Sequence, residues 1–210
     1  MRTKICDMVG VDFPLFAFSH CRDVVAAVTN AGGVGVLGAV GFTPEQLKME
    51  LDWIDGHVGG RPYGVDVAIP ENMAIKGETG LTSDVLWERI PDAHRRFADD
   101  FLVKFGVDPP SAKPSGENRE MGLMHDTAER SMDVVFQHPV RLVVQALGIA
   151  PQSLIDRGRA HGVPIGALIG SAEHARRQVE VGVEILVAQG TEAGGHCGEI
   201  TTMVLVPEVV

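Results

Sequence analysis

The stretch "VPIGALIGSAEHARRQVEVGVEILVAQG" (residues 163–190) contains two short apolar runs joined by a polar segment. The runs "VPIGALI" and "EILVAQG" are continuously apolar rather than alternating, as strands buried on both faces of a parallel sheet require. Between them, Ser171 is a suitable N-cap and Gly182 a suitable end for one helix. The stretch therefore predicts a strand, a helix and a parallel strand, which is the repeating unit of an α/β fold.

The same unit recurs along the rest of the chain. Four further runs are predicted to be buried strands: "FPLFAF" (13–18), "VGVLGA" (34–39), "YGVDVAI" (63–69) and "VRLVVQAL" (140–147). Helical spacing is present over residues 23–31, and residues 43–46 ("TPEQ") offer an N-cap, a proline at the first helical position and a capping-box glutamine. Near the C-terminus, Pro207 suits the first turn of a further helix. Six strands are thus predicted.

Residues 71–138 interrupt this rhythm. They contain the loop-like stretch "DPPSAKPSGENRE" (108–120) and two expected helices where a single helix would be enough. The segment follows the C-terminal end of the third strand, which is the face where α/β proteins build their sites. We expect a lid or substrate wall here, and a segment packed on the outside of the fold is an equally good interpretation.

Two architectures suit the repeat, an open doubly wound sheet and a (β/α)₈ barrel. "GVGVLG" (residues 33–38) matches the dinucleotide pattern G-x-G-x-x-G, but that fingerprint must follow a strand and open a helix. Here a helix precedes the motif, and the motif itself is a predicted strand, so its glycines are better suited to ending the helix and allowing close packing. We predict an α/β chain in the TIM-barrel class, a single domain over residues 1–210 that stops after about six of eight strands, with the insertion after the third. Either the chain is part of a longer barrel, or the barrel closes in another way.

Composition excludes several classes of protein. The chain has 210 residues, is 45% hydrophobic and carries a formal charge of −10, without a run of Lys or Arg. Nucleic acid and anionic membrane surfaces are therefore not expected partners. Cys6, Cys21 and Cys197 are too few for a disulfide framework and lack paired metal-binding spacing. Asp7 and Asp12 interrupt the region where a signal peptide would be apolar. We expect a soluble cytoplasmic protein.

The loop "AQGTEAGGHCG" (residues 188–198) follows the sixth predicted strand and so lies where barrels build active sites. Glycines occupy positions 190, 194, 195 and 198 of this loop. They leave room for a flat ligand against the main chain, and His196 is the side chain there that titrates near neutral pH. The pattern predicts a planar cofactor with a base beside it, the alternative being a tight turn with an idle histidine. Cys197 lacks a second base for a nucleophilic role, and a metal site lacks ligand spacing.

This loop resembles the signature loop of the nitronate monooxygenase family, also called 2-nitropropane dioxygenases, which are FMN-dependent (β/α)₈ barrels. The resemblance extends through "FPLFAFSH", "NAGGVGVLGA" and "YGVDVAIPEN" and covers nearly the whole chain. It implies that FMN is the cofactor and that an alkyl nitronate or nitroalkane is oxidised with O₂ to a carbonyl compound and nitrite. It leaves open whether the protein forms a homo-oligomer.

The resemblance also implies roles for individual residues in the loop. His196 falls on the catalytic base of the family, with Gly194 and Gly195 directly ahead of it. Gln189, at the end of the sixth strand, falls where the family contacts the flavin.

Further cofactor contacts are implied at the ends of earlier strands. Ala17 and Phe18 occupy the tip of the first strand, which lies along the isoalloxazine ring in the family. Asp66 stands where relatives usually carry an Asn that hydrogen-bonds the flavin, and Gln145 ends the fourth strand, where it is expected to face the same centre.

The sequence also departs from the family. Relatives usually read Ala-Pro-Met at the tip of the first strand, whereas this chain reads Ala17-Phe18-Ser19. The family binds the FMN phosphate with loops after strands seven and eight, which the six predicted strands do not include. Two alternatives follow, a flavin-dependent enoyl-acyl-carrier-protein reductase, which is similar across the same "EAGGH" loop, and a non-catalytic flavin-binding fragment.

Overall fold

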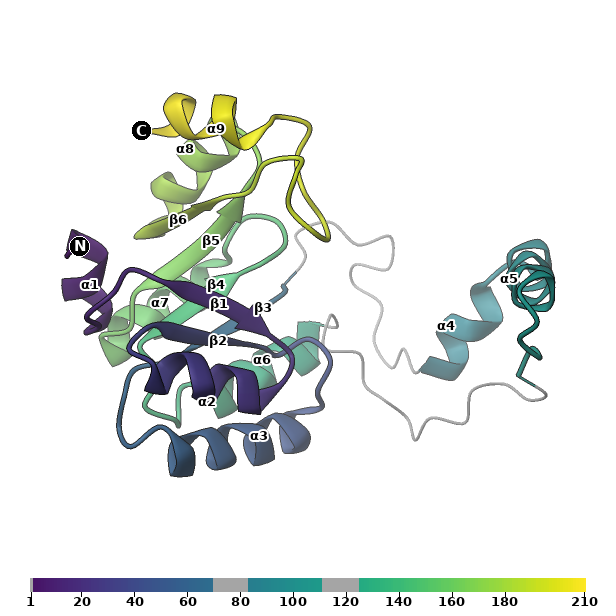
Figure 1. Ribbon diagram of the computed structural model, residues 1–210, viewed down its shortest axis with the longest axis horizontal. Helices are drawn as coiled ribbons and strands as arrows, with labels where there is room; N and C mark the ends of the chain where they lie inside the picture. The colour runs from purple at the N-terminus through teal and green to yellow at the C-terminus, as the bar shows by residue number, and fades with distance from the viewer. Residues whose placement is uncertain (1, 70–82, 111–124) are drawn as a thin grey trace. The chain divides into compact units, whose positions relative to one another are not determined.

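The computed structural model describes residues 2–69, 83–110 and 125–210 (Figure 1). The chain divides into two compact units. The first consists of Met1–Met73 with Gly122–Val210, and the second is Ala74–Met121.

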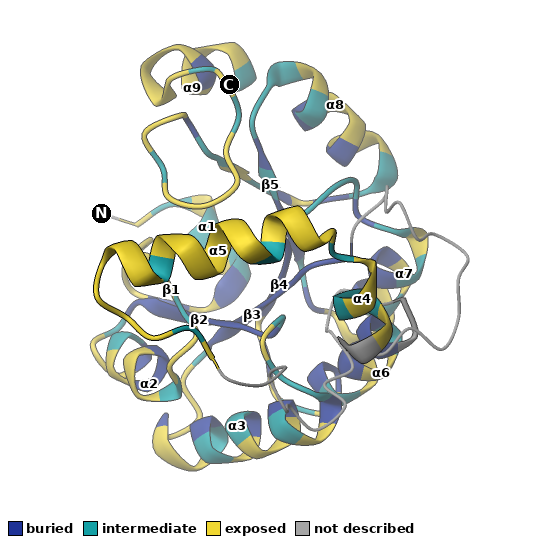
Figure 2. Cartoon of the chain, turned by 90° about the vertical axis from the view of Figure 1, so that its right-hand side faces the viewer, coloured by how far each residue is buried: buried dark blue, intermediate teal, exposed yellow. Residues whose placement is uncertain are grey.

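The first unit is built on one parallel sheet whose six strands lie side by side in chain order. The strands are β1 (Phe16–Ser19), β2 (Val34–Gly38), β3 (Gly64–Val67), β4 (Leu142–Gln145), β5 (Ile165–Ile169) and β6 (Ile185–Ala188). A doubly wound sheet would reverse its strand order at a switch point, and no reversal occurs among these strands. The sheet curls as a barrel wall does (Figure 2). The predicted α/β barrel with six of its eight strands is therefore confirmed.

Helices precede, connect and follow the strands of the first unit. All but the first of them pack on the outer face of the sheet, whereas the first contributes Cys6 and Val9 to the concave face. In this unit they are α1 (Lys4–Val9), α2 (Arg22–Asn30), α3 (Pro44–His57), α6 (His125–Val135), α7 (Gln152–His161), α8 (Ala172–Val181) and α9 (Thr202–Val209). The predicted capping box of α3 is present, since the Thr43 hydroxyl accepts from the Gln46 amide nitrogen at 3.2 Å and Gln46 Oε1 accepts from the Thr43 nitrogen at 3.0 Å. Ser171 caps α8, and Gly182 ends it with a φ of 106°.

The last helix starts earlier than its proline predicts. α9 begins at Thr202, so Pro207 lies inside the helix rather than in its first turn. The reason is a contact from the preceding loop, because the Glu192 carboxylate accepts from both the backbone nitrogen and the hydroxyl of Thr202 at 3.0 Å. A carboxylate that accepts from an unpaired N-terminal amide fixes the start of a helix.

Two apolar clusters lie on opposite faces of the sheet. The outer cluster joins strand residues to the covering helices and includes Leu37, Leu47, Leu51, Ile54, Val65, Met132, Val143, Leu154 and Ile165. The inner cluster fills the concave face and consists of Cys6, Val9, Val11, Val34, Val36, Leu142, Val144 and Ile185. Because side chains alternate along a strand, these two sets define which strand residues point into the barrel.

The position of Gly35 in β2 requires a residue without a side chain. A Cβ atom on this residue would collide with the Val25 carbonyl oxygen of α2. The glycine therefore lets α2 lie directly on β2, as expected for close packing rather than for phosphate binding.

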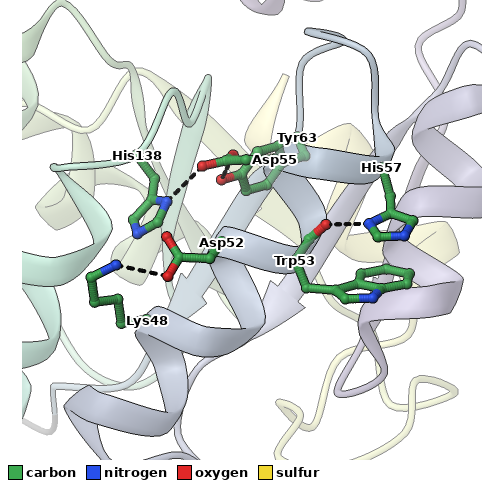
Figure 3. Close-up of polar contacts among 7 residues, drawn as sticks. All are labelled: Lys48, Asp52, Trp53, Asp55, His57, Tyr63 and His138. Atoms are coloured by element: carbon green, nitrogen blue, oxygen red, sulfur yellow. Dashed lines mark hydrogen bonds and ion pairs between the residues drawn. The ribbon is translucent and has the colours of Figure 1, made fainter.

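A partly buried polar network joins the parts of the first unit that lie before and after the insertion in the sequence (Figure 3). The Asp55 carboxylate of α3 accepts from the Tyr63 hydroxyl and contacts His138 Nδ1, both at 2.7 Å. Tyr63 directly precedes β3, and His138 lies shortly before β4. Burial, together with the hydrogen bond to Asp55, raises the pKa of Tyr63. One carboxylate thus fixes the approach to two neighbouring strands.

The second unit contains α4 (Ser83–Arg89) and α5 (Asp92–Lys104). The Arg95 guanidinium donates to the Trp87 carbonyl at 2.9 Å and joins the two helices. The insertion was predicted to span residues 71–138 and to contain two helices. The second unit ends earlier, at Met121, and α6, which falls inside the predicted range, belongs to the first unit and packs on α3. In the described part of the chain, no helix has the length and apolarity needed to cross a bilayer.

Candidate functional site

A cavity of about 480 Å³ opens at the C-terminal ends of β4, β5 and β6. It is lined by residues 146–148, 168–171, 189 and 196–200, together with His174. The cavity lies where parallel α/β sheets bind ligands, because the loops that follow the strands converge at this edge. Two of the predicted site residues, Gln189 and His196, line it.

The loop after β6 is folded against the end of β5. A Cβ on Gly198 would lie 2.6 Å from the Gly170 carbonyl oxygen, so the two glycines touch through their main chains. Gln189 Nε2 donates to the Gly194 carbonyl at 3.1 Å and closes the loop on itself. Gly190 is required for another reason, since a Cβ there would collide with Thr202. These contacts hold the loop against the ends of β5 and α9.

Gly194 and Gly195 face open space. No described atom lies within 4 Å of a Cβ built on either residue, and Gly195 has a φ of 77°, which favours glycine. His196 follows them as an exposed residue on the cavity wall. Its imidazole has no hydrogen-bond partner in the described part of the chain. An open main chain with an unengaged imidazole beside it suits a flat ligand that presents an acidic proton.

Besides His196, the predicted site includes one further titratable group, Asp66, which lies on the concave face of the sheet. It is aligned with Gly38 on β2 and Val144 on β4, and Val144 belongs to the inner cluster. Its residue is only 6% exposed, and no described residue hydrogen-bonds its carboxyl group. Burial raises the pKa of Asp66 to about 7. Near neutral pH this carboxyl group is therefore protonated in a large fraction of molecules and can act as a donor.

Phe18 lies near the C-terminal end of β1. This strand pairs with β2, which in turn pairs with β3, the strand that carries Asp66. Phe18 is aligned with Val36 of the inner cluster, is 56% exposed and contacts His20 edge to face with ring centroids 5.1 Å apart. A Cβ on Gly38 would lie 2.7 Å or less from both rings, so this glycine makes room for them. His20 was not predicted as a site residue. Ala17 precedes Phe18 and is aligned with Gly35, so it lies on the opposite face of the sheet, which α2 covers.

Gln145 faces the opposite side of the sheet from the one expected. It is aligned with Val67 and Ala167, which both belong to the outer cluster. The preceding residue, Val144, is aligned with Asp66 on the concave face, and side chains alternate along a strand, so Gln145 points outward. The side chain is fully buried, accepts from the Ile69 nitrogen at 3.2 Å and donates to the Ile69 carbonyl at 2.7 Å. Nε2 also donates to the Leu147 carbonyl, so Gln145 fastens the loops after β3 and β4, and donation from its amide to a ligand would require one of these bonds to open.

Sequence patterns missed one polar pair in the cavity wall. His174, in the first turn of α8, lines the cavity, and Gln178 one turn later lies behind it with no exposed surface. The only local signal is the spacing of four residues, which is common on polar helices. Across residues 2–69, 83–110 and 125–210, no three His, Cys, Asp or Glu side chains gather as a metal site requires.

Comparison with known proteins connects this geometry to a family. The family model described as nitronate monooxygenase matches residues 5–210. "Putative monooxygenase Rv1533" from Mycobacterium tuberculosis is 48% identical over 213 residues, which are 100% of this chain and 56% of that protein. "Probable nitronate monooxygenase" from Staphylococcus saprophyticus is 25% identical and aligns with 100% of this chain over 58% of its own length. The chain thus spans little more than half of these relatives.

Solved structures agree in fold. Nitroalkane oxidase from Streptomyces ansochromogenes superposes with a TM-score of 0.69 at 24% identity, over 99% of this chain and 57% of that chain. FabK from Thermotoga maritima superposes with a TM-score of 0.67 at 21% identity, over 100% and 50%. The family match covers the strands and the loop that carries His196, and with it the chain belongs to the nitronate monooxygenase family.

Proposed function

We propose that this chain carries the catalytic residues of an FMN-dependent oxidoreductase that converts alkyl nitronates, or nitroalkanes after deprotonation, with O₂ into a carbonyl compound and nitrite. The observation that supports this most strongly is the unengaged His196 on the wall of a cavity at the C-terminal ends of the strands, directly after the open glycines 194 and 195 of the same loop. Membership of the nitronate monooxygenase family supports the same assignment.

The residues fit the ring system of a flavin. The empty Cβ positions of Gly194 and Gly195 leave main-chain surface for a planar group, and the exposed Phe18 ring offers an apolar contact. The buried carboxyl group of Asp66 has no described partner, and in its protonated form it can donate to an acceptor on the ring, as the Asn of relatives would. When bound, FMN would supply the redox chemistry, and the protein would supply binding, orientation and proton transfer.

His196 is proposed as the general base. A neutral imidazole near pH 7 can remove the acidic proton next to a nitro group, and such a positioned base contributes about 10²- to 10⁴-fold in rate. A pre-formed nitronate has already lost that proton, so it needs only the electron-transfer part of the site. The alternative interpretations are a flavin-dependent enoyl-acyl-carrier-protein reductase and a non-catalytic flavin-binding protein.

Anaerobic reduction of the bound flavin separates these three functions. We expect propyl-2-nitronate to bleach the flavin absorbance of the FMN-loaded protein, and oxygen to restore it with release of nitrite. Bleaching by NADPH but not by the nitronate would instead support the reductase. If neither compound reduces the flavin, the proposed activity is wrong and a binding role remains.

A further inference from the structure

Gln178 has a single possible orientation in the wall of the cavity. Its Oε1 accepts from the Ala150 nitrogen at 3.1 Å, and its Nε2 donates to the Gly148 carbonyl at 2.9 Å. Because one backbone group is a donor and the other an acceptor, the two ends of the amide cannot be exchanged. The second hydrogen on Nε2 is therefore available to His174, whose own Nε2 lies 3.2 Å away.

This contact sets the tautomer of His174. The amide can only donate at this position, so the imidazole Nε2 must accept, and the ring proton lies on Nδ1. The ring of His174 is half-buried in the cavity wall, and no described residue engages its Nδ1. A fully buried glutamine thus holds an imidazole with one fixed donor next to the cavity.

The cavity combines this donor with the proposed base. His196 and Gln189 come from the loop after β6, whereas His174 comes from α8. Glu199 is the acidic side chain of the lining, and it is exposed. The two imidazoles differ in that His196 has no described partner, while Nε2 of His174 is already engaged by Gln178.

We propose that His174 is a further binding residue of this site, which donates from Nδ1 to an oxygen of a planar oxyanion, and that Gln178 is the positioning residue that fixes this donor. The proposal rests on the proposed function in one respect, because a nitronate is such an anion, with its charge shared by two oxygens. A neutral donor suits this ligand, since it orients the anion without returning an acidic proton to the carbon.

Isobutyrate is a suitable unreactive probe, because its carboxylate has the shape and charge of the nitronate of 2-nitropropane. Titration of the purified chain with isobutyrate, followed through the imidazole ¹⁵N resonances, reports both the tautomer and the affinity. We expect His174 to show a protonated Nδ1 and an accepting Nε2 before addition, and the Nδ1 resonance to shift on binding.

Three variants separate a donor role from a packing role. In His174→Asn the amide nitrogen falls near the place of Nδ1, whereas in His174→Gln it falls near the place of Nε2. We expect His174→Phe and His174→Gln to bind isobutyrate about 10- to 100-fold more weakly, as loss of a hydrogen bond to a charged group predicts. His174→Asn should retain most of the affinity, and His94→Phe, which removes an exposed histidine of the second unit, should retain all of it.

Gln178→Leu tests the positioning residue. We expect it to leave the fold intact by circular dichroism, to give a mixture of His174 tautomers, to weaken isobutyrate binding, and to raise KM for propyl-2-nitronate by a larger factor than it lowers kcat. Equal affinity in wild type, His174→Phe and His174→Gln, or an Nε2-protonated His174 in the wild type, overturns the inference. If isobutyrate binds through His174 but nitronate does not reduce the flavin, the proposed function fails while the anion site stands.

Discussion

Gly198 touches Gly170 through the main chain, so closely that a Cβ on Gly198 would lie 2.6 Å from the Gly170 carbonyl oxygen. This contact presses the loop after β6 onto the end of β5 and places His196 on the cavity wall. Neither residue is in the left-handed region of the backbone, so the glycines are required by the close approach and not by their conformation.

Gly198→Ala should therefore destabilise the protein by about 1–3 kcal/mol, because the backbone must shift to admit the methyl group. Gly194→Ala is the matched change, since its Cβ meets no described atom within 4 Å. We expect Gly194→Ala to leave the free energy of unfolding unchanged while weakening FMN binding. Urea unfolding and flavin titration measure the two effects, and equal stability of both variants would contradict the packing argument.

His196→Ala should slow turnover of a neutral nitroalkane by about 10²- to 10⁴-fold, because the proposed base is lost. Flavin binding should persist, since the contacts of Gly194 and Gly195 come from the main chain. Oxidation of pre-formed nitronate should fall much less, and steady-state kinetics on both substrates measure the difference. Equal losses on both would show that His196 orients the substrate instead of removing its proton.

Asp66→Asn should change how stability depends on pH. Burial raises the pKa of Asp66 from 3.8 to about 7, so the folded protein holds a proton that the unfolded chain releases between these values. The wild type therefore loses stability as pH rises from about 4 to about 7, by roughly 4 kcal/mol as an upper bound. Asparagine has no charge to desolvate, so the stability of the variant relative to the wild type should increase as pH rises through this window.

Urea unfolding at pH 5 and pH 8 tests this, with Asp52→Asn as the control. A hydrogen bond from Lys48 lowers the pKa of Asp52 below its ordinary value of 3.8, so this carboxyl group is ionised at both pH values in the folded and unfolded protein, and Asp52→Asn should differ from wild type by the same amount at pH 5 and pH 8. A constant difference between Asp66→Asn and wild type at both pH values would show that Asp66 is already ionised in the folded protein.

Asp55→Ala should destabilise the first unit by about 1–3 kcal/mol, because it leaves the buried Tyr63 hydroxyl without its acceptor and His138 without its partner. Asp52→Ala on the same helix removes a pair with Lys48 whose side chains are 55% and 54% exposed, and such pairs contribute little (Figure 3). Thermal unfolding of the two variants should thus differ clearly. Similar melting temperatures would mean that the Asp55 network does not hold β3 and β4.

Residues 1–210 alone should bind FMN far more weakly than a chain that also carries two further βα units. β1 and β6 are not paired with each other, and Phe16 and Val187 on these strands are 36% and 41% exposed. Two additional strands would close the barrel and bring the phosphate-binding loops of the family. Equal affinity of the two proteins, measured by flavin fluorescence, would show that the phosphate is held in another way.

The amino-acid sequence by itself determined the positions of the six strands and of the caps that begin α3 and α8. These features depend on neighbours along the chain, since continuous apolar runs predict buried strands and Thr43 or Ser171 needs only the amide three residues later. The loop that carries His196 was also identified from its own residues. Its functional role stays a prediction.

Only the tertiary structure decided which way the side chains near the site point and which groups they meet. Gln145 faces the helices because strand register pairs Val144 with Asp66, and α9 begins at Thr202 because Glu192 reaches its first amide. The raised pKa of Asp66 and the fixed tautomer of His174 likewise depend on burial and on the placement of the loop after β4. Such contacts join segments far apart in sequence, and no local pattern encodes their register.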